Sequence, residues 1–377
     1  MKLVFVEVCT TMRYDYLIVG AGLFGSICAH ELTKKGKKCM VIDKNSFVGG
    51  NCHSTIIKGI SVSTFGPHIL HTNNKVVWDY LNNLTSFSPI HLANKVYYKG
   101  KFYSFPINLF TLHQLWGTNT PEEAEEILKH KRVNISNPKN FEEYYLSTIG
   151  QELYEIFIEG YSKKQWKIPL TDLDCSVAKR LPIRFTFNDN YFYEKYCGVP
   201  ENGYMPMFNY LLKNITVTLN TDFTEDRKYW NSIANQIIFS GRIDQYYQFQ
   251  YGPLEYRTTK FVREHLNINH FQGCGVINYT EESIPFTRIV EYKYLTPQCK
   301  NTTSTIIVRE YPDEWEENKN PMYPINTPKN KDAYHQYFTL ASTERNVHFG
   351  GRLGAYSYMN MDCVVKAALK MVSICEK

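Results

Sequence analysis

The sequence predicts an α/β fold, because residues 14–51 read as two apolar strands joined by an amphipathic helix. The strands are residues 14–19 and 39–42, and the helix between them covers residues 26–35. A glycine-rich turn follows each strand. A strand, a helix and a strand in this order, joined by short turns, predict a parallel sheet of the Rossmann-like class.

The first glycine turn has the spacing G-x-G-x-x-G that is typical of dinucleotide binding. Gly20 makes the tight turn, Gly22 lets the backbone approach a pyrophosphate, and Gly25 lets the helix pack closely on the strand. The helix N-terminus then stabilises the phosphate charge. Asp43 ends the second strand, where a carboxylate accepts a hydrogen bond from a ribose hydroxyl. The alternative, a turn that binds nothing, does not explain why all the parts occur together.

A second glycine pair, Gly49-Gly50, comes soon after this acid and just before Asn51. It is similar to the pair in FAD enzymes of the glutathione-reductase type, where it lets the backbone pass the flavin. NAD enzymes usually lack this pair. FAD is therefore the predicted cofactor.

The composition indicates a globular protein with a small anionic ligand. The chain has 377 residues, of which 43% are hydrophobic and 21% charged, enough for two or three domains with apolar cores. A net charge of +5 without any basic run fits an anionic small substrate better than a nucleic acid. No apolar run approaches the roughly 18 residues of a membrane span, so no membrane insertion is predicted.

Ten cysteines are scattered without a C-x-x-C pair, which argues against a disulfide framework or a zinc site and favours a reducing cytoplasm. His68 and His71 lie three residues apart, but no third ligand is near, so no metal site is predicted. For these histidines, ordinary packing and a role beside the flavin remain equally open.

Local patterns predict further elements along the chain. They are a helix over residues 75–84, a hairpin turning at Lys99-Gly100, helix starts at Thr120 and Asn140, strand-like alternation over 245–258, and a last helix from Met361.

These elements predict a discontinuous FAD-binding domain that is interrupted by a mostly helical insertion and by an antiparallel sheet region. The expected boundaries are an N-terminal extension over 1–12, an FAD-binding domain over 13–75, 200–245 and 340–377, a helical domain over 76–185, and a sheet domain over 186–199 and 246–339.

From Phe157 onward the sequence carries motifs that are specific to one family. They include residues 157–166 (FIEGYSKKQW), 180–184 (RLPIR), 190–192 (NYF), 200–204 (PENGY), 241–246 (GRIDQY), 287–293 (TRIVEYK) and 351–358 (GRLGAYSY). In this order they closely resemble UDP-galactopyranose mutase of the bacterial type, and the likeness covers essentially Tyr14 to the C-terminus.

The resemblance implies a non-redox flavoenzyme that interconverts UDP-galactopyranose and UDP-galactofuranose, as in galactofuranose biosynthesis for cell-surface polysaccharide. Reduced FAD attacks the anomeric carbon through N5, UDP leaves and later returns, and no net oxidation occurs. The implied partners are a UDP-sugar and a second copy of the chain in a cytoplasmic homodimer.

The resemblance also implies roles for residues of this sequence, by position in its motifs. The catalytic set is Arg180, Arg288 and His68. The FAD contacts are Gly20, Gly22, Phe24, Gly25, Asp43, Lys44, Gly50, Asn51, His68, Ile69, Arg352, Asn360 and Met361. The substrate contacts are Phe157, Tyr161, Ser162, Trp166, Arg180, Tyr191, Asn278, Arg288, Tyr323 and Tyr358.

These residue types suit the chemistry. A leaving diphosphate needs fixed cations, and an Arg fork matches phosphate oxygens better than Lys does. A uracil ring favours aromatic neighbours such as Tyr161 and Trp166, although a plain helix core is the alternative explanation for them.

Two positions depart from the family, which usually has Asp where Asn360 stands and Thr where Met205 stands. The alternatives to a mutase are an FAD oxidase of the amine-oxidase type, which the cationic pair of arginines disfavours, and a non-catalytic UDP-sugar-binding homologue.

Overall fold

The computed structural model describes residues 13–178, 183–299 and 302–376. The chain divides into two units. Unit 1 contains the described residues up to Gly50, Met207–Tyr251, and those from Gln336 onward. Unit 2 contains Asn51–Pro206 and Gly252–His335.

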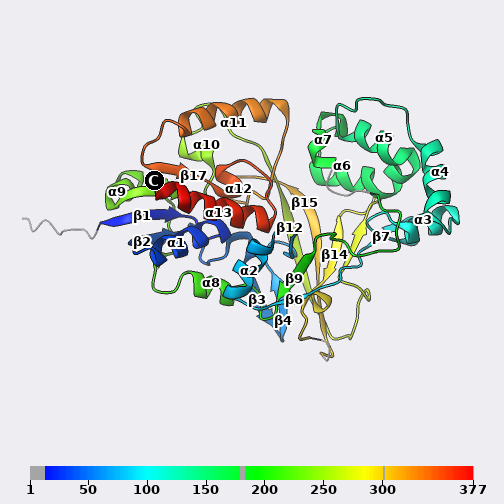
Figure 1. Cartoon of the computed structure of the whole chain (residues 1–377), viewed down its shortest axis with the longest axis horizontal. Coiled ribbons are helices and arrows are strands. Elements are labelled where there is room, and N and C mark those ends of the chain that lie inside the picture. Colours follow the sequence, from blue (N-terminus) through cyan, green and yellow to red (C-terminus); the bar gives the residue numbers. More distant parts are fainter. Residues whose placement is uncertain (1–12, 179–182, 300–301, 377) are drawn as a thin grey trace, which may run out of the picture. The chain divides into compact units, whose positions relative to one another are not determined.

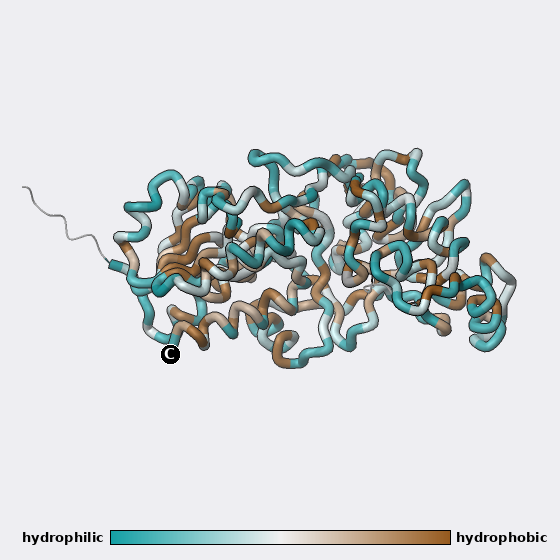
Figure 2. The backbone as a smooth tube through the Cα atoms, turned by 90° about the horizontal axis from the view of Figure 1, so that it is seen from above, coloured by the Kyte–Doolittle hydropathy of each residue, from teal (hydrophilic) through white to brown (hydrophobic). Residues whose placement is uncertain are grey.

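Unit 1 is built on a five-stranded parallel sheet in the order β10-β2-β1-β11-β17. The first two strands along the chain have the predicted bounds, and segments distant in sequence supply the others. The strands are β1 (Tyr14–Val19), β2 (Cys39–Ile42), β10 (Thr216–Thr218), β11 (Ala234–Phe239) and β17 (Val347–Phe349). They form a hydrophobic layer in Figure 2, as expected for a parallel sheet that is covered on both faces.

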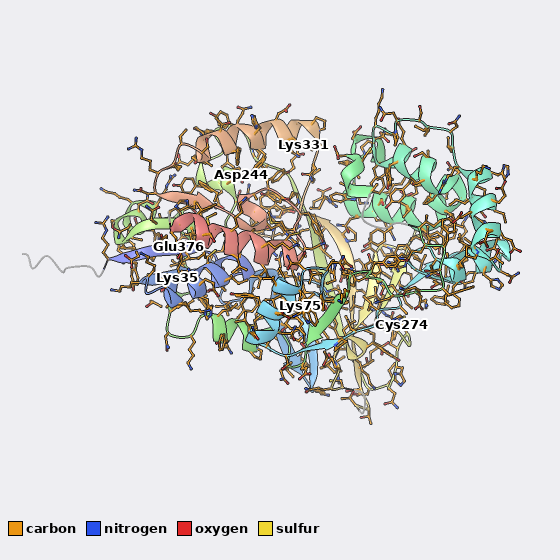
Figure 3. The ribbon with its side chains drawn as sticks, viewed as in Figure 1. Lys35, Lys75, Asp244, Cys274, Lys331 and Glu376 are labelled. Carbon is orange, nitrogen blue, oxygen red and sulfur yellow. The ribbon has the colours of Figure 1, made fainter. Side chains whose placement is uncertain are left out.

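Helices α1 (Leu23–Lys34) and α13 (Met361–Cys375) lie side by side in unit 1 (Figure 1). Their ends are joined by an ion pair, with 2.7 Å between Lys35 Nζ and Glu376 Oε1 (Figure 3). Tyr16 Oη also donates to Cys375 O at 2.9 Å. The remaining helices of this unit are α9 (Arg227–Ile233), α10 (Ile243–Tyr246) and α12 (Gly351–Gly354).

Unit 2 contains a seven-stranded sheet in the order β16-β12-β15-β14-β13-β7-β8. All neighbours are antiparallel except β13 and β7. The strands are β7 (Lys95–Tyr98), β8 (Lys101–Ser104), β12 (Tyr256–Leu266), β13 (Val276–Tyr279), β14 (Arg288–Glu291), β15 (Thr305–Glu314) and β16 (Tyr323–Pro324). Lys99 and Gly100 both have positive φ, so the predicted hairpin turn is confirmed.

The helices of unit 2 share one hydrophobic cluster with strands β7 and β8, in which Leu112, Leu128 and Leu153 are fully buried. Thr120 and Asn140 cap their helices as predicted, each by accepting from a backbone N–H three residues on. The helices are α3 (Leu109–Trp116), α4 (Pro121–Lys131), α5 (Phe141–Tyr154), a π-helical turn (Glu155–Glu159), α6 (Gly160–Trp166) and α7 (Cys175–Ala178).

Two smaller sheets and one helix complete unit 2. Strands β3 (Ser54–Ile57) and β4 (Ile60–Ser63) pair with each other. Strands β5 (Leu70–Thr72), β9 (Tyr196–Pro200) and β6 (Phe87–Pro89) form a second sheet, and α2 (Lys75–Leu84) has its predicted bounds.

Two local expectations differ from the structure. Residues 245–255 form no strand, because the preceding segment turns into α10, where Arg242 Nη2 donates to Asp244 Oδ2 at 2.6 Å inside the protein. A 14-residue helix, α11 (Pro328–Ala341), was not anticipated in this polar stretch. It lies, like α8 (Met205–Leu211), where the chain passes from one unit to the other.

The unit boundaries differ from the expected three-part division. The structure groups residues 51–75 with unit 2, and it joins β7 and β8 of the expected helical segment to the antiparallel sheet. Separate helical and sheet domains stay a prediction. Among the described residues, no helix is long and apolar enough to cross a bilayer.

Candidate active site

The glycine turn after β1 has no room for side chains. Gly20 has a φ of +108°, and a Cβ on it would lie 2.1 Å from Ser240 Oγ. Ser240 is itself fixed, since its Oγ and its N both donate to Val19 O, at 2.8 and 2.9 Å. A Cβ on Gly25 would lie 2.0 Å from Gly20 O, so α1 packs directly on the turn. This is the geometry that the G-x-G-x-x-G spacing predicts.

The start of α1 fits an anion. Its N-cap is Gly22, which has no side chain to accept from the first N–H groups of the helix. The two glycine turns touch at this point, because Gly22 bridges Gly49 and a Cβ on Gly50 would lie 3.0 Å from Gly22 Cα. A bare backbone at a helix N-terminus is what a dinucleotide pyrophosphate requires. The residues present therefore fit FAD, and the individual contacts stay predictions.

The Asp43 carboxylate stabilises the glycine turn after β1. It is 7% exposed, and its Oδ2 accepts from Ala21 N at 2.7 Å. Its Oδ1 accepts from Asn45 N at 2.8 Å and from Asn45 Nδ2 at 2.9 Å. An ionised carboxylate has about four acceptor sites, so capacity for a ribose hydroxyl remains. Asp43 thus fixes the glycine turn, and its expected ribose contact stays a prediction.

The C-terminal part of unit 1 packs on the same turn. A Cβ on Gly350 would lie 2.2 Å from Phe24 Cζ, so this chain segment is in direct contact with the start of α1. Beyond it, Arg352 Nη2 donates to Met359 O at 2.8 Å, and the guanidinium lies 4.5 Å above the Tyr358 ring. Folding therefore brings together Phe24, Arg352 and Tyr358, which sequence motifs alone had assigned to ligands.

Asn360 is the N-cap of α13, with extended φ and ψ of −68° and 161°, but its side chain makes no capping bond. The helix begins at Met361 as predicted. Lys44 is exposed beside the Asp43 turn. The roles of all three residues toward FAD stay predictions.

In unit 2, the predicted substrate residues Asn278 and Arg288 are direct partners across β13 and β14. Arg288 is in turn opposite Glu310 of β15. Residues paired in this way point to the same face of a sheet. The three strands therefore present an amide, a guanidinium and a carboxylate in one row.

Arg288 and Glu310 form an ion pair with 2.7 Å between Nε and Oε2. The Arg288 side chain is 25% exposed and that of Glu310 only 4%. Burial alone would lower the pKa of Arg288, but the facing Glu310 carboxylate raises it above its ordinary value. Among the described residues, neither Nη group of Arg288 has a hydrogen-bond partner and buried Glu310 Oε1 has none. The bond through Nε leaves the two Nη groups available to an anion.

Two tyrosines from other elements lie near this guanidinium. Tyr161 of α6 and Tyr323 of β16 are close enough to act electrostatically on Arg288. Trp166, at the end of α6, packs against the hydrophobic cluster of the helices, and Ser162 is 5% exposed. Folding thus places part of the predicted nucleotide-binding set around one cation.

Phe157 and Tyr191 belong to one aromatic cluster. Phe157 is 2% exposed, and its ring lies 6.1 Å from the Phe105 ring in a stacked arrangement. Tyr191 lies 6.2 Å from Phe105 on another side. The π-helical turn holds Phe157 inside the core, so packing accounts for it fully and its contact with substrate stays a prediction.

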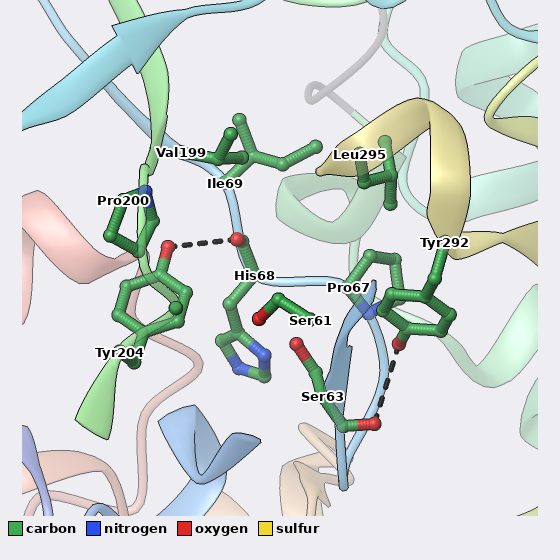
Figure 4. A pocket seen from close by; sticks show the side chains of 11 residues that line it. Ser61, Ser63, Pro67, His68, Ile69, Val199, Pro200, Tyr204, Tyr292 and Leu295 are labelled. Atoms are coloured by element: carbon green, nitrogen blue, oxygen red, sulfur yellow. Dashed lines mark hydrogen bonds between the residues drawn. The ribbon is translucent and has the colours of Figure 1, made fainter. Parts of the chain in front are cut away.

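His68 lines a small cavity of about 20 Å³ with Ser61, Ser63, Tyr204 and Tyr292 (Figure 4). A cavity of this size can hold about one water molecule. His68 Nδ1 lies 2.9 Å from Gly66 O, and because a carbonyl only accepts, Nδ1 carries the proton. Tyr204 Oη donates to His68 O at 2.8 Å. These bonds fix both the backbone and the tautomer of His68.

The other histidine of the pair has a structural explanation. His71 Nδ1 lies 2.8 Å from Glu194 Oε1, and its ring stacks on Phe192 at 4.0 Å.

Three further predicted site residues remain. Asn51 accepts from Asn320 Nδ2 at 2.8 Å, and Ile69 is 8% exposed. Arg180 lies outside the described residues, so its assignment stays a prediction.

Sequence reasoning missed two buried charges, Glu310 and Lys164. An acid at one inward position of an otherwise apolar strand could have indicated Glu310. The KKQW motif contains Lys164, but nothing in the motif tells a buried lysine from an exposed one.

Two family models match the chain. Residues 156–358, more than half of the chain, match the UDP-galactopyranose mutase model, and residues 18–84 match an NAD(P)-binding Rossmann-like domain. A probable UDP-galactopyranose mutase of Klebsiella pneumoniae is 37% identical over 94% of this chain and 93% of its own length. A dTDP-fucopyranose mutase of Escherichia coli is 35% identical over 95% of this chain and 97% of its own length.

Among solved structures, a reduced UDP-galactopyranose mutase superposes with a TM-score of 0.76, covering 96% of this chain and 93% of that one. The two sequences are 15% identical in that alignment, so this likeness supports the fold alone.

Gly20→Ala tests whether the glycine turn after β1 binds the dinucleotide. The new Cβ would meet Ser240 Oγ and strain a positive φ, so we expect dinucleotide affinity to fall by about tenfold or more. The affinity is measured from the amount of flavin that each protein retains after gel filtration, and then by titration of the protein with FAD. Gly36→Ala is the matched control, since Gly36 also has positive φ (+79°) but nothing lies within 4 Å of its Cβ position. Equal flavin retention by both variants would contradict the assigned geometry.

Proposed function

The chain belongs to the UDP-galactopyranose mutase family, and we propose that it interconverts UDP-galactopyranose and UDP-galactofuranose. It is accordingly an isomerase with FAD as its cofactor. The observation that carries the proposed substrate chemistry is the row Asn278, Arg288 and Glu310, in which Nε of the guanidinium binds Glu310 and both Nη groups are left available to an anion.

When bound and reduced, FAD supplies the nucleophile, N5, for the anomeric carbon of the sugar. The protein must then hold a departing nucleoside diphosphate close enough to return. Arg288 suits this task because a guanidinium binds phosphate oxygens through two parallel N–H groups and stays charged throughout. Glu310 keeps that charge in place, and Tyr161 and Tyr323 add hydroxyl donors nearby. Arg180 is proposed as a second diphosphate ligand.

The proposed roles of the other residues follow from their surroundings. Because Nδ1 of His68 donates to Gly66 O, the neutral ring has its acceptor at Nε2, which can accept a proton or a hydrogen bond at the proposed flavin edge. Trp166 offers an aromatic face to the nucleotide base. Because these groups bind and orient and none is oxidised, they suit a rearrangement without net electron transfer.

A second substrate has a specific observation in its favour. The Escherichia coli relative is named dTDP-fucopyranose mutase and is nearly as similar as the Klebsiella protein. Both names describe a ring-form change of a nucleotide-linked sugar, so dTDP-fucose is the alternative substrate of the same chemistry.

We also propose that the enzyme is a cytoplasmic homodimer. The nine cysteines within the described residues are free thiols, which fits a reducing compartment. Only the family resemblance supports the dimer, and multi-angle light scattering of the holoenzyme would test it.

Turnover under controlled reduction tests the proposed function. We expect dithionite-reduced holoenzyme to convert UDP-galactofuranose to UDP-galactopyranose over many turnovers without consuming reductant, because the flavin acts as a nucleophile. Chromatography of the nucleotide sugars measures the products. Equal turnover by strictly oxidised enzyme contradicts this mechanism, and hydrogen peroxide formed from an amine indicates an oxidase. Binding without turnover indicates a non-catalytic homologue, and a higher kcat/KM for dTDP-fucofuranose assigns the alternative substrate.

Arg288→Ala should lower kcat/KM by roughly 30- to 1000-fold, since one charge-assisted phosphate contact is worth about 2–4 kcal/mol in the transition state. Arg288→Lys keeps a positive charge opposite Glu310 but loses the two parallel N–H groups of the guanidinium. Its kcat/KM should therefore lie between those of Arg288→Ala and wild type. Arg263→Ala is the control: Arg263 is an exposed arginine on β12, which β15 separates from β14, and kcat/KM of this variant should stay within about twofold of wild type. Thermal melting of each variant separates lost catalysis from unfolding. An Arg288→Ala enzyme within threefold of wild type would show that Arg288 does not touch the substrate.

A further inference from the structure

Lys164 is a buried cation that the proposed mechanism does not use. It is 5% exposed, although it lies in the seven-residue helix α6 between Ser162 and Trp166. Lysine is almost never buried unless its charge is satisfied, because removing an ammonium from water costs several kcal/mol. Its partners therefore indicate what the burial achieves.

Three backbone carbonyls surround the ammonium. Lys164 Nζ donates to the carbonyl oxygens of Tyr279, Ile284 and Phe286, at 2.7, 2.9 and 2.9 Å. An ammonium has three N–H donors, so this arrangement satisfies each of them once. No carboxylate takes part in these bonds, and the interaction is therefore one between a charge and a folded loop.

The loop that supplies these carbonyls joins β13 to β14. Tyr279, which directly follows Asn278, is the last residue of β13, and the loop runs from there to Arg288, the first residue of β14. Helix α6, which carries Lys164, also carries Tyr161 and Trp166. One ammonium thus links the helix with the proposed base-binding residues to the hairpin with the proposed diphosphate-binding residue.

Other contacts at the same junction show how closely the helix and the loop approach. A Cβ on Gly160 would lie 2.2 Å from Thr280 O, so only glycine fits where α6 begins. Thr280 Oγ1 donates to Ile156 O in the π-helical turn at 2.6 Å. Arg257 Nε donates to Gln165 O from β12 at 3.1 Å. The helix, the π-helical turn and the loop are therefore in direct contact at this junction.

We infer that Lys164 is a positioning residue that fixes α6 against the β13–β14 loop and so sets the shape of the pocket for the nucleoside end of the substrate. The inference rests on the proposed function, since it assigns Tyr161, Trp166 and Asn278 to the nucleotide. Arg288 is held separately by its register with Glu310. Loss of Lys164 should consequently weaken nucleotide binding and leave the chemical step almost intact.

The charge environment decides how the junction responds to pH. Burial lowers the pKa of Lys164 to about 8, although Glu281 and Glu282 act in the opposite direction. Below this pKa three N–H groups meet three carbonyls, and above it the amine has one donor too few. Because this pKa lies below the ordinary lysine value of 10.5, loss of the proton favours the closed junction over an opened one, and nucleotide binding should not weaken as the pH rises through about 8. Other charged groups near α6 among the described residues include Glu159 and Lys163, which pair with each other on the helix surface, Arg257 of β12, and the ion pair of Arg288 and Glu310.

Lys164→Met tests the inference, because methionine keeps the length and apolar stem of the side chain without its charge. Loss of three charge-assisted bonds should raise the KM for the nucleotide sugar and the Kd for UDP by about 10- to 100-fold, with kcat within about threefold. Hydrogen exchange of the amides in residues 279–287 should accelerate without ligand, while that of α1 stays unchanged.

Lys163→Met is the matched control. Its side chain is 43% exposed and forms surface ion pairs with Glu159 at 2.8 Å and with Glu282 of the loop at 3.9 Å. Exposed pairs contribute little, so KM, Kd and exchange should remain close to wild type. If Lys164→Met does not fold, Thr280→Val removes one bond of the same junction and should raise the Kd for UDP by about threefold.

A Kd for UDP in Lys164→Met that equals that of Lys163→Met would overturn the inference while leaving the mutase activity in place. Equal losses of kcat and flavin binding would also overturn it, since they indicate general disruption of the fold. Wild-type protein that neither binds nor converts either nucleotide sugar overturns the proposed function, and the inference with it.

Discussion

The ion pair of Arg288 and Glu310 is the interaction on which the proposed substrate site depends. A guanidinium taken out of water needs an opposite charge at a fixed distance, and the register of β14 and β15 supplies it. Because the pair is made by strand pairing, the same hydrogen-bonded row also positions Asn278 on the sheet face. The hydrogen bonds between the strand backbones thereby fix the relative positions of Asn278, Arg288 and Glu310, which flexible side chains alone could not fix.

Unit 1 fixes its glycine turn mainly by bringing backbones together, with the Asp43 carboxylate accepting from Ala21 N in addition. Ser240, which directly follows β11, packs against the turn at Gly20, and Gly350, which directly follows β17, is in contact with the start of α1. Segments far apart in the sequence meet within van der Waals distance of a helix N-terminus. Only glycine allows this approach, and the result is an electrostatically positive surface of N–H groups.

Elements governed by neighbouring residues were predicted closely. Helix α2 has its predicted bounds, Thr120 caps α4, and the turn at Lys99-Gly100 has the expected positive φ values. The strand predicted over residues 245–255 was wrong: the alternating pattern suggested a strand, but the chain forms the end of α10 and a loop there. Helix α11 was not predicted, since its sequence is polar and its buried contacts come from other segments.

By itself the sequence determined the β-α-β unit, its glycine turns and the family motifs, and hence the cofactor and the enzyme class. The physics of these features is contained within a few consecutive residues. Only the tertiary structure decided that Glu310 faces Arg288, 22 residues away, and that Lys164 binds a carbonyl 115 residues away. A buried charge is tolerated only where folding delivers its partners, and no local pattern specifies which distant groups those are.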